Sequence, residues 1–399
     1  METAGGIGPV QKRERVAALD AVRGFAILGI LLVNIELFRG PELLFSFAGE
    51  GGPTGIDAVL SALISTFAES KFITTLAFLF GLGFALQGMR AAERGRSPGR
   101  LLARRLSVLA LFGVIHAVFI WSGDILLTYA IIGFVFLLFY RRRPRTMVIW
   151  AGVFIGVPLL VTTLFAILVA LAPAGGETGP PPAFLVEIGR NAEAAYTSGS
   201  YPQMVLQRLT ELSFLLPVSL FAYGGVILCM MLLGGAVARA GWVPGLDSPR
   251  RAVKRAAAIG ILAGLPLNAA YALLSRDGSD AAAVFGLPLF VVGAPLLAVG
   301  YMAAVTLLVR RFPNGEITRR LAAVGRLALT NYLSQSIVMT AVFYGLGLYG
   351  SVSLLTALLI AAALLAAQLV LSPIYLRRFD QGPAEWLWRR LTYGRQTGK

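Results

Sequence analysis

Residues 19–38, LDAVRGFAILGILLVNIELF, decide the fold because they form a stretch of about 20 mostly apolar residues. A helix of that length crosses the roughly 30 Å hydrocarbon core of a bilayer. Basic residues precede the stretch, but no small-residue cleavage site follows it, so it is predicted to be a retained span and not a signal peptide. The sequence therefore indicates a chain whose first helix lies in the membrane.

Similar apolar blocks recur along all 399 residues, of which 57% are hydrophobic and only 14% charged. We predict an all-α fold, a polytopic membrane helix bundle with about ten transmembrane helices. The predicted spans are residues 19–38, 72–89, 103–121, 124–140, 146–172, 213–237, 253–274, 284–309, 327–346 and 353–376. In this prediction residues 1–376 form the bundle, and residues 377–399 form a cytoplasmic amphipathic tail.

The placement of the basic residues sets the predicted orientation. The net charge is +15, and with both termini in the cytoplasm all but five of the 35 lysines and arginines fall on the cytoplasmic side. This asymmetry follows the positive-inside rule, so the basic runs are orientation signals and no nucleic-acid partner is expected. The abundance of Arg and Ala with only four Lys suggests a bacterial genome, and the bacterial cytoplasmic membrane is the expected location.

Two segments are not predicted to be simple spans. Residues 57–69 are too short to cross and are predicted to form an interfacial or re-entrant helix on the outer side. Residues 173–212 begin with a Pro/Gly-rich run and continue with helical periodicity, which predicts an external helical loop that covers the outer face. A single Cys and a single His exclude an internal disulfide and a Cys/His metal cluster, so no metal is expected.

The only histidine, His116, lies near the outer end of the third predicted span, and Asp124 opens the next helix after a Trp-Ser-Gly break. This tight turn predicts that the two side chains lie at similar depth on adjacent antiparallel helices. An aspartate that holds one imidazole nitrogen leaves the other as a base, so we interpret the pair as catalytic or proton-handling. The alternative is a histidine that only forms a hydrogen bond between helices.

Several charged and polar residues are candidates for an anion site that opens to the cytoplasm. Asp20, Arg23 and Asn34 share one stripe of the first helix, and Arg105 lies three helical turns before His116 on the same face. Arg326 stands at the cytoplasmic end of the ninth span. Arginines suit the phosphates of a cofactor. A structural ion pair between Asp20 and Arg23 is the alternative.

The ninth span carries too many polar residues for a helix that faces lipid. Asn331 and Gln335 share one of its faces and are candidates for substrate binding, although hydrogen bonds to other helices explain them as well. Lys71, next to Glu69 at the outer end of the second span, is a further substrate-binding candidate that could reach toward Asp124. An interfacial charge pair between Lys71 and Glu69 is the alternative.

Five stretches of the sequence, in their order along nearly the whole chain, resemble the YeiB-like DUF418 family of bacterial membrane proteins. They are LDAVRGFAILGILLVNI (19–35), KFITTLAFLFGLGFAL (71–86), HAVFIWSGDILLTYAIIG (116–133), GRLALTNYLSQS (325–336) and FDQGPAEWLWRRLTYG (379–394). That family is in turn distantly similar to transmembrane acyltransferases such as the lysosomal heparan-α-glucosaminide N-acetyltransferase. Those enzymes take an acyl group from cytoplasmic acyl-CoA and transfer it to an acceptor across the membrane.

The resemblance implies that Asp20, Arg23 and Asn34 belong to an acyl-donor channel, and related acyltransferases can form a homodimer. One departure concerns the base. The proposed catalytic histidine of the heparan enzyme lies in the loop after the first helix, whereas the corresponding residues 38–55 contain none. His116 would therefore act from a different helix.

Three functions are compatible with these residues. The first is a transmembrane acyltransferase with acyl-CoA as donor and a glycan, a lipid headgroup or a small metabolite as acceptor. The second is a proton-coupled small-molecule transporter, in which Asp20, His116 and Asp124 relay protons and the ninth helix lines the substrate path. The third is a structural or sensing membrane protein whose polar residues only join helices. In each case membrane lipid is the surrounding partner.

Overall fold

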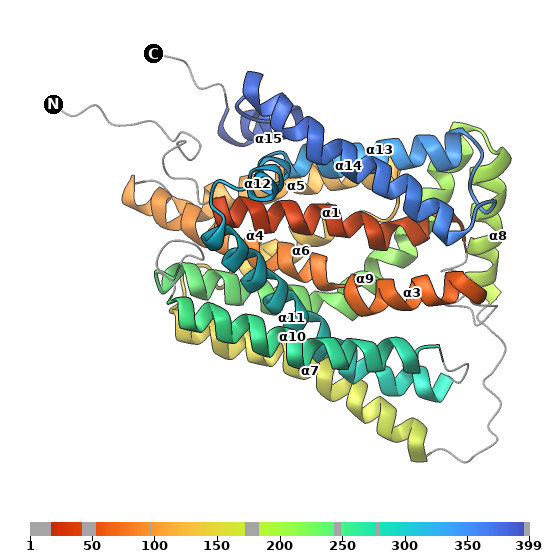
Figure 1. Cartoon of the computed structure of the whole chain (residues 1–399), viewed down its shortest axis with the longest axis horizontal. Helices are drawn as coiled ribbons and strands as arrows, with labels where there is room; N and C mark the ends of the chain where they lie inside the picture. The colour runs from red at the N-terminus through yellow and green to blue at the C-terminus, as the bar shows by residue number, and fades with distance from the viewer. Residues whose placement is uncertain are drawn as a thin grey trace.

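The computed structural model describes residues 17–41, 53–95, 97–171, 183–242, 249–276 and 280–394. In these ranges the chain is helical, with turns between helices and no β-strand, as the all-α prediction requires. Most helices pack side by side with their axes roughly along one common line (Figure 1). Their bounds are α1 Ala17–Arg39, α3 Gly55–Phe67, α4 Lys71–Glu93, α5 Pro98–Ile115, η2 His116–Ile120, α6 Leu126–Phe136, α7 Pro144–Leu171, α8 Ala183–Ser198, α9 Tyr201–Arg239, α10 Arg250–Leu274, α11 Asp280–Arg311, α12 Glu316–Arg326, α13 Ala328–Thr340, η3 Ala341–Gly345, α14 Leu354–Arg378 and α15 Pro383–Tyr393.

Within the described ranges, eight helical segments are long and apolar enough to cross a membrane. Two predicted spans are shorter than expected. The span predicted at 124–140 is reduced to α6, with 11 residues, because the chain turns immediately after Phe136. The span predicted at 327–346 consists of α13 and the π-helical segment η3, and Leu327 interrupts the helix between α12 and α13. The lengths of these two helices therefore depart from the usual 20 residues.

The predicted external loop 173–212 is also partly wrong, because α9 already begins at Tyr201 and not at residue 213. Ser200 caps α9: its backbone N–H donates to the Gln203 side chain at 2.7 Å, which fixes this early start. The loop therefore contains α8 and the first turns of α9. Its Pro/Gly-rich beginning, residues 173–182, lies outside the described residues.

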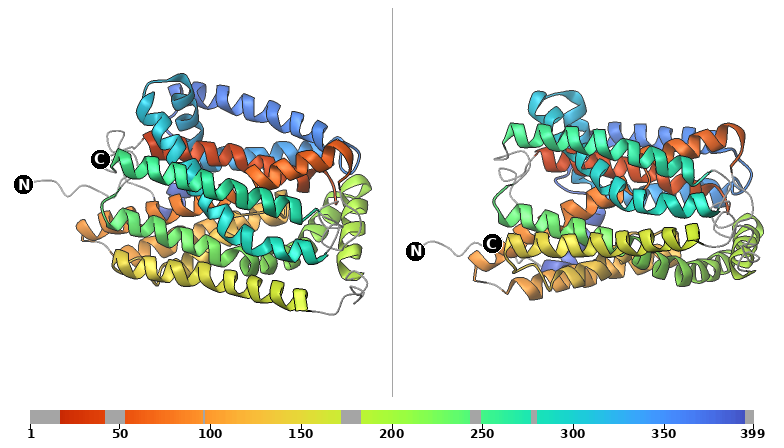
Figure 2. Two further views of the ribbon diagram at one scale, coloured as in Figure 1. Left: turned by 60° about the horizontal axis from the view of Figure 1, so that its bottom comes forward. Right: turned by 90° about the horizontal axis from the view of Figure 1, so that it is seen from below.

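The helix α8 lies across one end of the bundle, which is the outer end in the predicted orientation (Figures 1 and 2). The start of α1 and the helix α15 lie at the opposite end. The two terminal helices therefore lie at the same end of the bundle, which is the cytoplasmic end in the predicted orientation. The terminal residues 1–16 and 395–399 themselves lie outside the described part of the chain.

Close helix crossings depend on glycine. A Cβ atom at Gly24 in α1 would overlap the backbone carbonyl oxygen of Leu321 in α12, and one at Gly325 would overlap the carbonyl oxygen of Asp20. Within lipid no hydrophobic force drives helices together, so small residues that allow close van der Waals contact are favoured at such crossings. The crossing of α1 and α12 fixes the cytoplasmic end of the predicted anion site.

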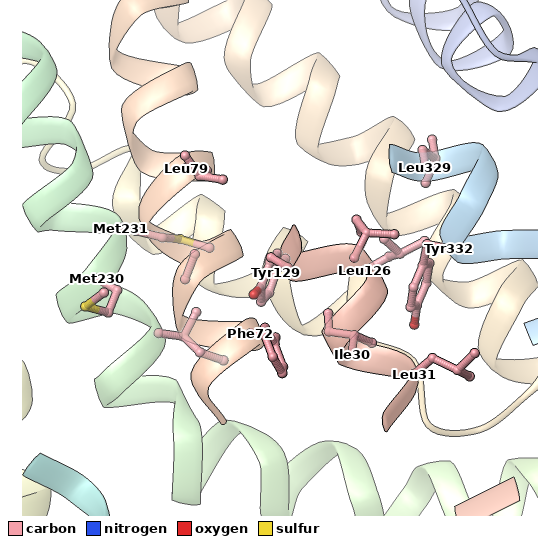
Figure 3. Close-up of a cluster of buried hydrophobic side chains, with 14 of the residues drawn as sticks. Ile30, Leu31, Phe72, Leu79, Leu126, Tyr129, Met230, Met231, Leu329 and Tyr332 are labelled. Carbon is pink, nitrogen blue, oxygen red and sulfur yellow. The ribbon is translucent and has the colours of Figure 1, made fainter. Parts of the chain in front are cut away.

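Apolar side chains fill the interior and also cover the outside. Figure 3 shows residues of α1, α4, α6, α9 and α13 that meet in the core, including Ile30, Phe72 and Tyr332. The helix α7, by contrast, exposes most of its apolar residues, and Leu168 is 66% exposed. A long helix with an exposed apolar surface suits contact with lipid, so the fold is that of a membrane protein.

Candidate functional site

The first part of the candidate site is built at the outer end of α5, where the helix widens into the π-helical turn η2. The turn begins at His116 and closes with a hydrogen bond from the Trp121 backbone N–H to the His116 carbonyl oxygen, at 2.8 Å. Segments of π-helix are rare and frequently lie at functional sites. Here the widened turn carries the only imidazole of the chain, and that imidazole is fully buried.

The structure brings His116 and Asp124 together. Nδ1 of His116 lies 2.8 Å from Oδ1 of Asp124. The second carboxylate oxygen, Oδ2, accepts a hydrogen bond from the Leu127 backbone N–H at 2.6 Å, so the aspartate is fixed at the beginning of α6. The contact is a close charge approach and not an aligned hydrogen bond, because Nδ1 and Nε2 of His116 and Oδ1 of Asp124 all have no hydrogen-bond partner of standard geometry among the described residues. The carboxylate therefore stands beside one ring nitrogen, and the other is available as a base.

This pair is sealed from solvent, contrary to the expected polar passage. Neither the His116 nor the Asp124 side chain has any exposed surface. The ring of Tyr332 packs 5.2 Å from the imidazole, and the ring of Trp121 lies edge-on at 6.4 Å, measured between ring centroids. Water or a substrate can therefore reach Nε2 only after one of the covering side chains moves.

A pocket lies on the other side of Trp121, between the bundle and α8. Its buried acidic group is Glu211 of α9, which accepts hydrogen bonds from the hydroxyls of Ser122 and Tyr196, the latter at 2.9 Å. Burial raises the pKa of the Tyr196 phenol well above its usual range, and the Glu211 carboxylate acts in the same direction. The phenol therefore stays protonated and donates to Glu211.

Glu211 was not among the predicted site residues, because residues 173–212 were expected only to cover the outer face. Glu211 follows Arg208 by three residues, so both lie on one face of α9. Arg208 is 1% exposed, and Nη1 donates to the Phe119 carbonyl oxygen at 3.0 Å. The sequence did contain a signal for this site: Glu211 follows Arg208 by three residues, directly before an apolar span.

Lys71 takes part in a second buried polar group, which we call the outer charge cluster: Glu36, Ser61, Ser65, Glu69, Lys71, Tyr271 and Arg276. The Lys71 side chain is fully buried, and Nζ donates to the Ser65 carbonyl oxygen at 2.5 Å. The expectation that Lys71 reaches toward Asp124 is therefore wrong. The side chain turns to α3 because that helix offers a carbonyl group next to the start of α4.

Arg276 closes this cluster from α10. Its Nη2 atom donates to the hydroxyls of Ser61 at 2.8 Å and Ser65 at 2.9 Å. The Tyr271 hydroxyl donates to Glu69 at 3.3 Å, and Glu36 contacts Ser61. The charges of the cluster therefore balance, because it contains two acidic side chains, Glu36 and Glu69, and two basic ones, Lys71 and Arg276. Glu36 stands in the first quoted stretch of the sequence, where a carboxylate among apolar residues was a visible signal.

The predicted anion site is only partly assembled at the inner end. Arg23 Nη1 donates to Asp20 Oδ1 at 2.8 Å, and 34% of the Arg23 side chain is exposed. Asn34 lies 11 residues farther along α1, about 16 Å from Arg23 at 1.5 Å per residue. These residues therefore share a helix face, but Asn34 cannot contact the same small group as Arg23.

Arg105 does not face an open cytoplasmic mouth as predicted. Its guanidinium lies 4.2 Å from the centroid of a Trp388 ring, and Nη1 donates to the Tyr393 hydroxyl at 3.0 Å. Arg326 donates to the carbonyl oxygen of Asp380 at 3.2 Å. The tail helix α15 thus packs on the bundle and covers Arg105, because stacking on an indole satisfies a buried guanidinium.

Asn331 and Gln335 are engaged in hydrogen bonds between helices. Asn331 Nδ2 donates to the Ser372 hydroxyl at 3.2 Å, and Gln335 Nε2 donates to Gln368 Oε1 at 2.9 Å and to the Ile27 carbonyl oxygen at 3.2 Å. Both side chains are buried. This geometry favours the alternative interpretation of the polar helix, in which it joins α13 to α14 and α1.

The fold and these sites define a class: a polytopic helical membrane protein with a buried His–Asp pair near the end of the bundle that is predicted to face outward. Comparison with known proteins identifies the family. Residues 237–395 match the family described as "Protein of unknown function (DUF418)". The chain belongs to this YeiB-like DUF418 family, because it is similar over nearly its full length to several bacterial members.

Three relatives show this similarity. The chain is 34% identical over 401 residues to the uncharacterized protein YxaH of Bacillus subtilis, with 96% of each chain covered. It is 33% identical over 386 residues to the uncharacterized protein YeiB of Escherichia coli, with 95% of this chain and 96% of the relative covered. An uncharacterized 39.9 kDa protein in the amylase 3′ region of Bacillus acidopullulyticus is 29% identical over 392 residues, covering 97% of this chain and 96% of the relative. No solved structure matches the chain.

Proposed function

We propose that the protein is a membrane acyltransferase of the bacterial cytoplasmic membrane in which His116 acts as a general base. The observation that supports this proposal is the approach of Asp124 Oδ1 to within 2.8 Å of His116 Nδ1, next to an Nε2 atom that makes no hydrogen bond among the described residues. A carboxylate that orients one ring nitrogen prepares the other to accept a proton.

In this role Nε2 takes the proton of a hydroxyl or amine on the acceptor and so makes that group nucleophilic. Asp124 then stabilises the imidazolium ion that forms. Because the pair lies near the outer end of the bundle, the acceptor in this proposal approaches from the outer face. The seal formed by Trp121 and Tyr332 would exclude water from the base until an acceptor displaces it.

The donor in this proposal is acyl-CoA, and the predicted residues do not form an open site for its phosphates. Arg105 is buried under the tail helix. Arg23 and Arg326 are partly exposed, but Arg23 is paired with Asp20 and Arg326 donates to the Asp380 carbonyl oxygen in the loop before the tail helix. No step is therefore assigned to the donor. The proposal depends on the base and its orientation.

The test uses the full-length protein in lipid nanodiscs with radiolabelled acetyl-CoA and a panel of hydroxyl and amine acceptors. We expect slow turnover that His116→Ala abolishes while the thermal stability stays close to that of the wild type. Glu316→Gln, at an exposed carboxylate of α12, is the matched control and should leave turnover unchanged. Turnover of His116→Ala equal to that of the wild type would contradict the proposal. A wild-type protein that neither turns over acyl-CoA nor changes its thermal stability when acyl-CoA is added would contradict it as well.

A proton-coupled transporter is the second candidate, and the outer charge cluster favours it. Buried ionisable residues in membrane helices frequently mark ion pathways. In proteoliposomes with an imposed pH gradient, this function would give solute flux that acyl-CoA does not affect and that the charge-balanced double variant Glu69→Gln/Lys71→Met eliminates. Flux that survives in this folded double variant would remove the cluster from the transport path.

A further inference from the structure

The chain between the two residues of the His–Asp pair contains carbonyl groups at the end of a helix. Phe119 and Ile120 are the last residues of η2, and Trp121 after them has an extended backbone, with φ −163° and ψ 130°. The last carbonyl groups of a helix have no partner within that helix, and a buried carbonyl group without a partner is costly. Other helices must therefore provide partners for this stretch.

The helices α9 and α13 provide these partners. The Phe119 carbonyl oxygen accepts a hydrogen bond from Tyr201 Oη at 2.8 Å and another from Arg208 Nη1 at 3.0 Å. The next carbonyl oxygen, that of Ile120, accepts from Thr340 Oγ1 of α13 at 3.3 Å. The end of the π-helical turn is therefore held by side chains that lie far away in the sequence.

The same helix, α9, holds the chain again after Trp121. The Ser122 hydroxyl donates to the Glu211 carboxylate, and the Ser122 carbonyl oxygen accepts from the Asp124 backbone N–H at 2.8 Å. Glu211 follows Arg208 by three residues, so both side chains lie on one face of α9. This face therefore contacts the link between the paired residues on both sides of Trp121.

Arg208 and Glu211 are themselves fixed and buried. Arg208 is 1% exposed and Glu211 is 5% exposed. Oε1 of Glu211 accepts from Gln207 Nε2 at 3.0 Å, and Oε2 accepts from the Tyr196 hydroxyl at 2.9 Å. Replacing buried charges by hydrophobic residues of similar volume is often neutral or stabilising, so stability alone does not account for two charged residues at this place. Their contacts with the link give them a more specific role.

We propose that Arg208 and Glu211 are positioning residues that act on the His–Asp pair through the link 119–122. By fixing this link on both sides of its indole, they hold the Asp124 carboxylate beside Nδ1 of His116. A carboxylate at this nitrogen favours the tautomer with the proton on Nδ1, which leaves Nε2 unprotonated, as a base must be. The inference rests on the proposed function only for the role of that base.

The test measures the tautomer of His116, which is the only histidine of the chain. Full-length protein labelled with ¹⁵N-histidine in lipid nanodiscs gives one pair of ring-nitrogen signals by solid-state NMR. In the wild type we expect the neutral ring to carry its proton mainly on Nδ1. Ser122→Ala removes the hydroxyl that binds Glu211 and should lower the ratio of this tautomer to the other by up to about tenfold, as the loss of one hydrogen bond to a charged group does.

Variants of α9 test the second contact. Arg208→Met removes the donor to Phe119 and should lower the ratio as well, whereas Arg208→Lys keeps a donor and should bring the ratio back toward the wild-type value. Because removal of one buried charge can unfold the protein, the balanced double variant Arg208→Met/Glu211→Gln is measured too and should show the lowered ratio. Ser213→Ala is the matched control for Ser122→Ala, because the Ser213 hydroxyl donates within α9, to the Thr210 carbonyl oxygen at 2.7 Å.

The outcomes separate this inference from the proposed function, because the tautomer is measured without any substrate. A lowered ratio in Ser122→Ala and in the double variant, in a protein that transfers no acyl group, would support the positioning role and contradict the acyltransferase. Acyl transfer together with wild-type ratios in both folded variants would do the reverse. A wild-type ring that carries its proton mainly on Nε2, or an equal change in Ser213→Ala, would also overturn the inference.

Discussion

Nδ1 of His116, the first residue of η2, and Oδ1 of Asp124, in the five-residue link 121–125 before α6, lie 2.8 Å apart. The contact depends on two local features. The π-helical turn η2 places the imidazole inside the bundle, and the Leu127 N–H holds the second aspartate oxygen. A short sequence element thus brings the pair together, while distant segments cover it.

Asp124→Asn should lower acyl transfer without unfolding the protein. The amide keeps an oxygen for the Leu127 N–H, but it no longer stabilises a positively charged imidazole. General acid–base groups contribute about 10²–10⁴-fold, so we expect a loss in that range. The measurement is the single-turnover rate at saturating acyl-CoA, with thermal unfolding as the control. A rate within about twofold of the wild type would mean that Asp124 has no role in the reaction.

Gly24→Ala should destabilise the bundle, because the new methyl group would collide with the Leu321 carbonyl oxygen and force α1 from α12. Overpacking of this kind costs about 1–3 kcal/mol. The matched control is Gly83→Ala in α4, where nothing lies within 4 Å of the added Cβ atom. The control should leave stability unchanged or raise it by about 0.5–1 kcal/mol. Equal thermal unfolding temperatures for the two variants would show that the helices do not cross so closely.

Glu385→Ala should loosen the start of α13. The Glu385 carboxylate accepts hydrogen bonds from the backbone N–H groups of Leu329 at 2.7 Å and Thr330 at 3.1 Å. Removing it leaves two N–H groups of a helix start without this partner, a loss of about 1–3 kcal/mol. Hydrogen exchange at residues 328–331 should accelerate, whereas Glu316→Ala at the exposed end of α12 should leave that exchange unaltered.

Lys71→Met alone should destabilise the protein more than the double variant Lys71→Met/Glu69→Gln does. Breaking a balanced buried group by removing one partner costs about 3–5 kcal/mol, because the opposite charge is left in the interior. Removing Glu69 together with Lys71 restores the balance. A double-mutant cycle on unfolding free energies measures this coupling. Additive effects would show that the two residues do not interact.

Trp388→Ala should uncover Arg105, because the indole ring stacks on its guanidinium. If the arginine then binds phosphates, acyl-CoA affinity increases relative to the wild type. Trp386→Ala, on the exposed side of the same helix, is the control and should not change the affinity. The readout is isothermal titration with acyl-CoA in nanodiscs. Equal affinities in the two variants would exclude Arg105 from the donor site.

One part of the candidate site, the proximity of His116 and Asp124, could be inferred from the sequence, because the two residues are close neighbours along the chain. His116 and Asp124 belong to one helix–turn–helix element, and an acidic residue at a helix start is a local preference. Glu211 and Arg276 could not be assigned partners in this way. Their contacts, with Ser122 and with Ser61 and Ser65, join segments 89 to 215 residues apart.

The sequence by itself determined the membrane class and most of the long helices, since these depend on local hydropathy and on the length of apolar stretches. Only the tertiary structure decided that the tail covers Arg105, that Lys71 turns to Ser65, and that α8 closes a pocket over Glu211. A buried polar group must find a partner, and which partner it finds depends on which helices pack beside it.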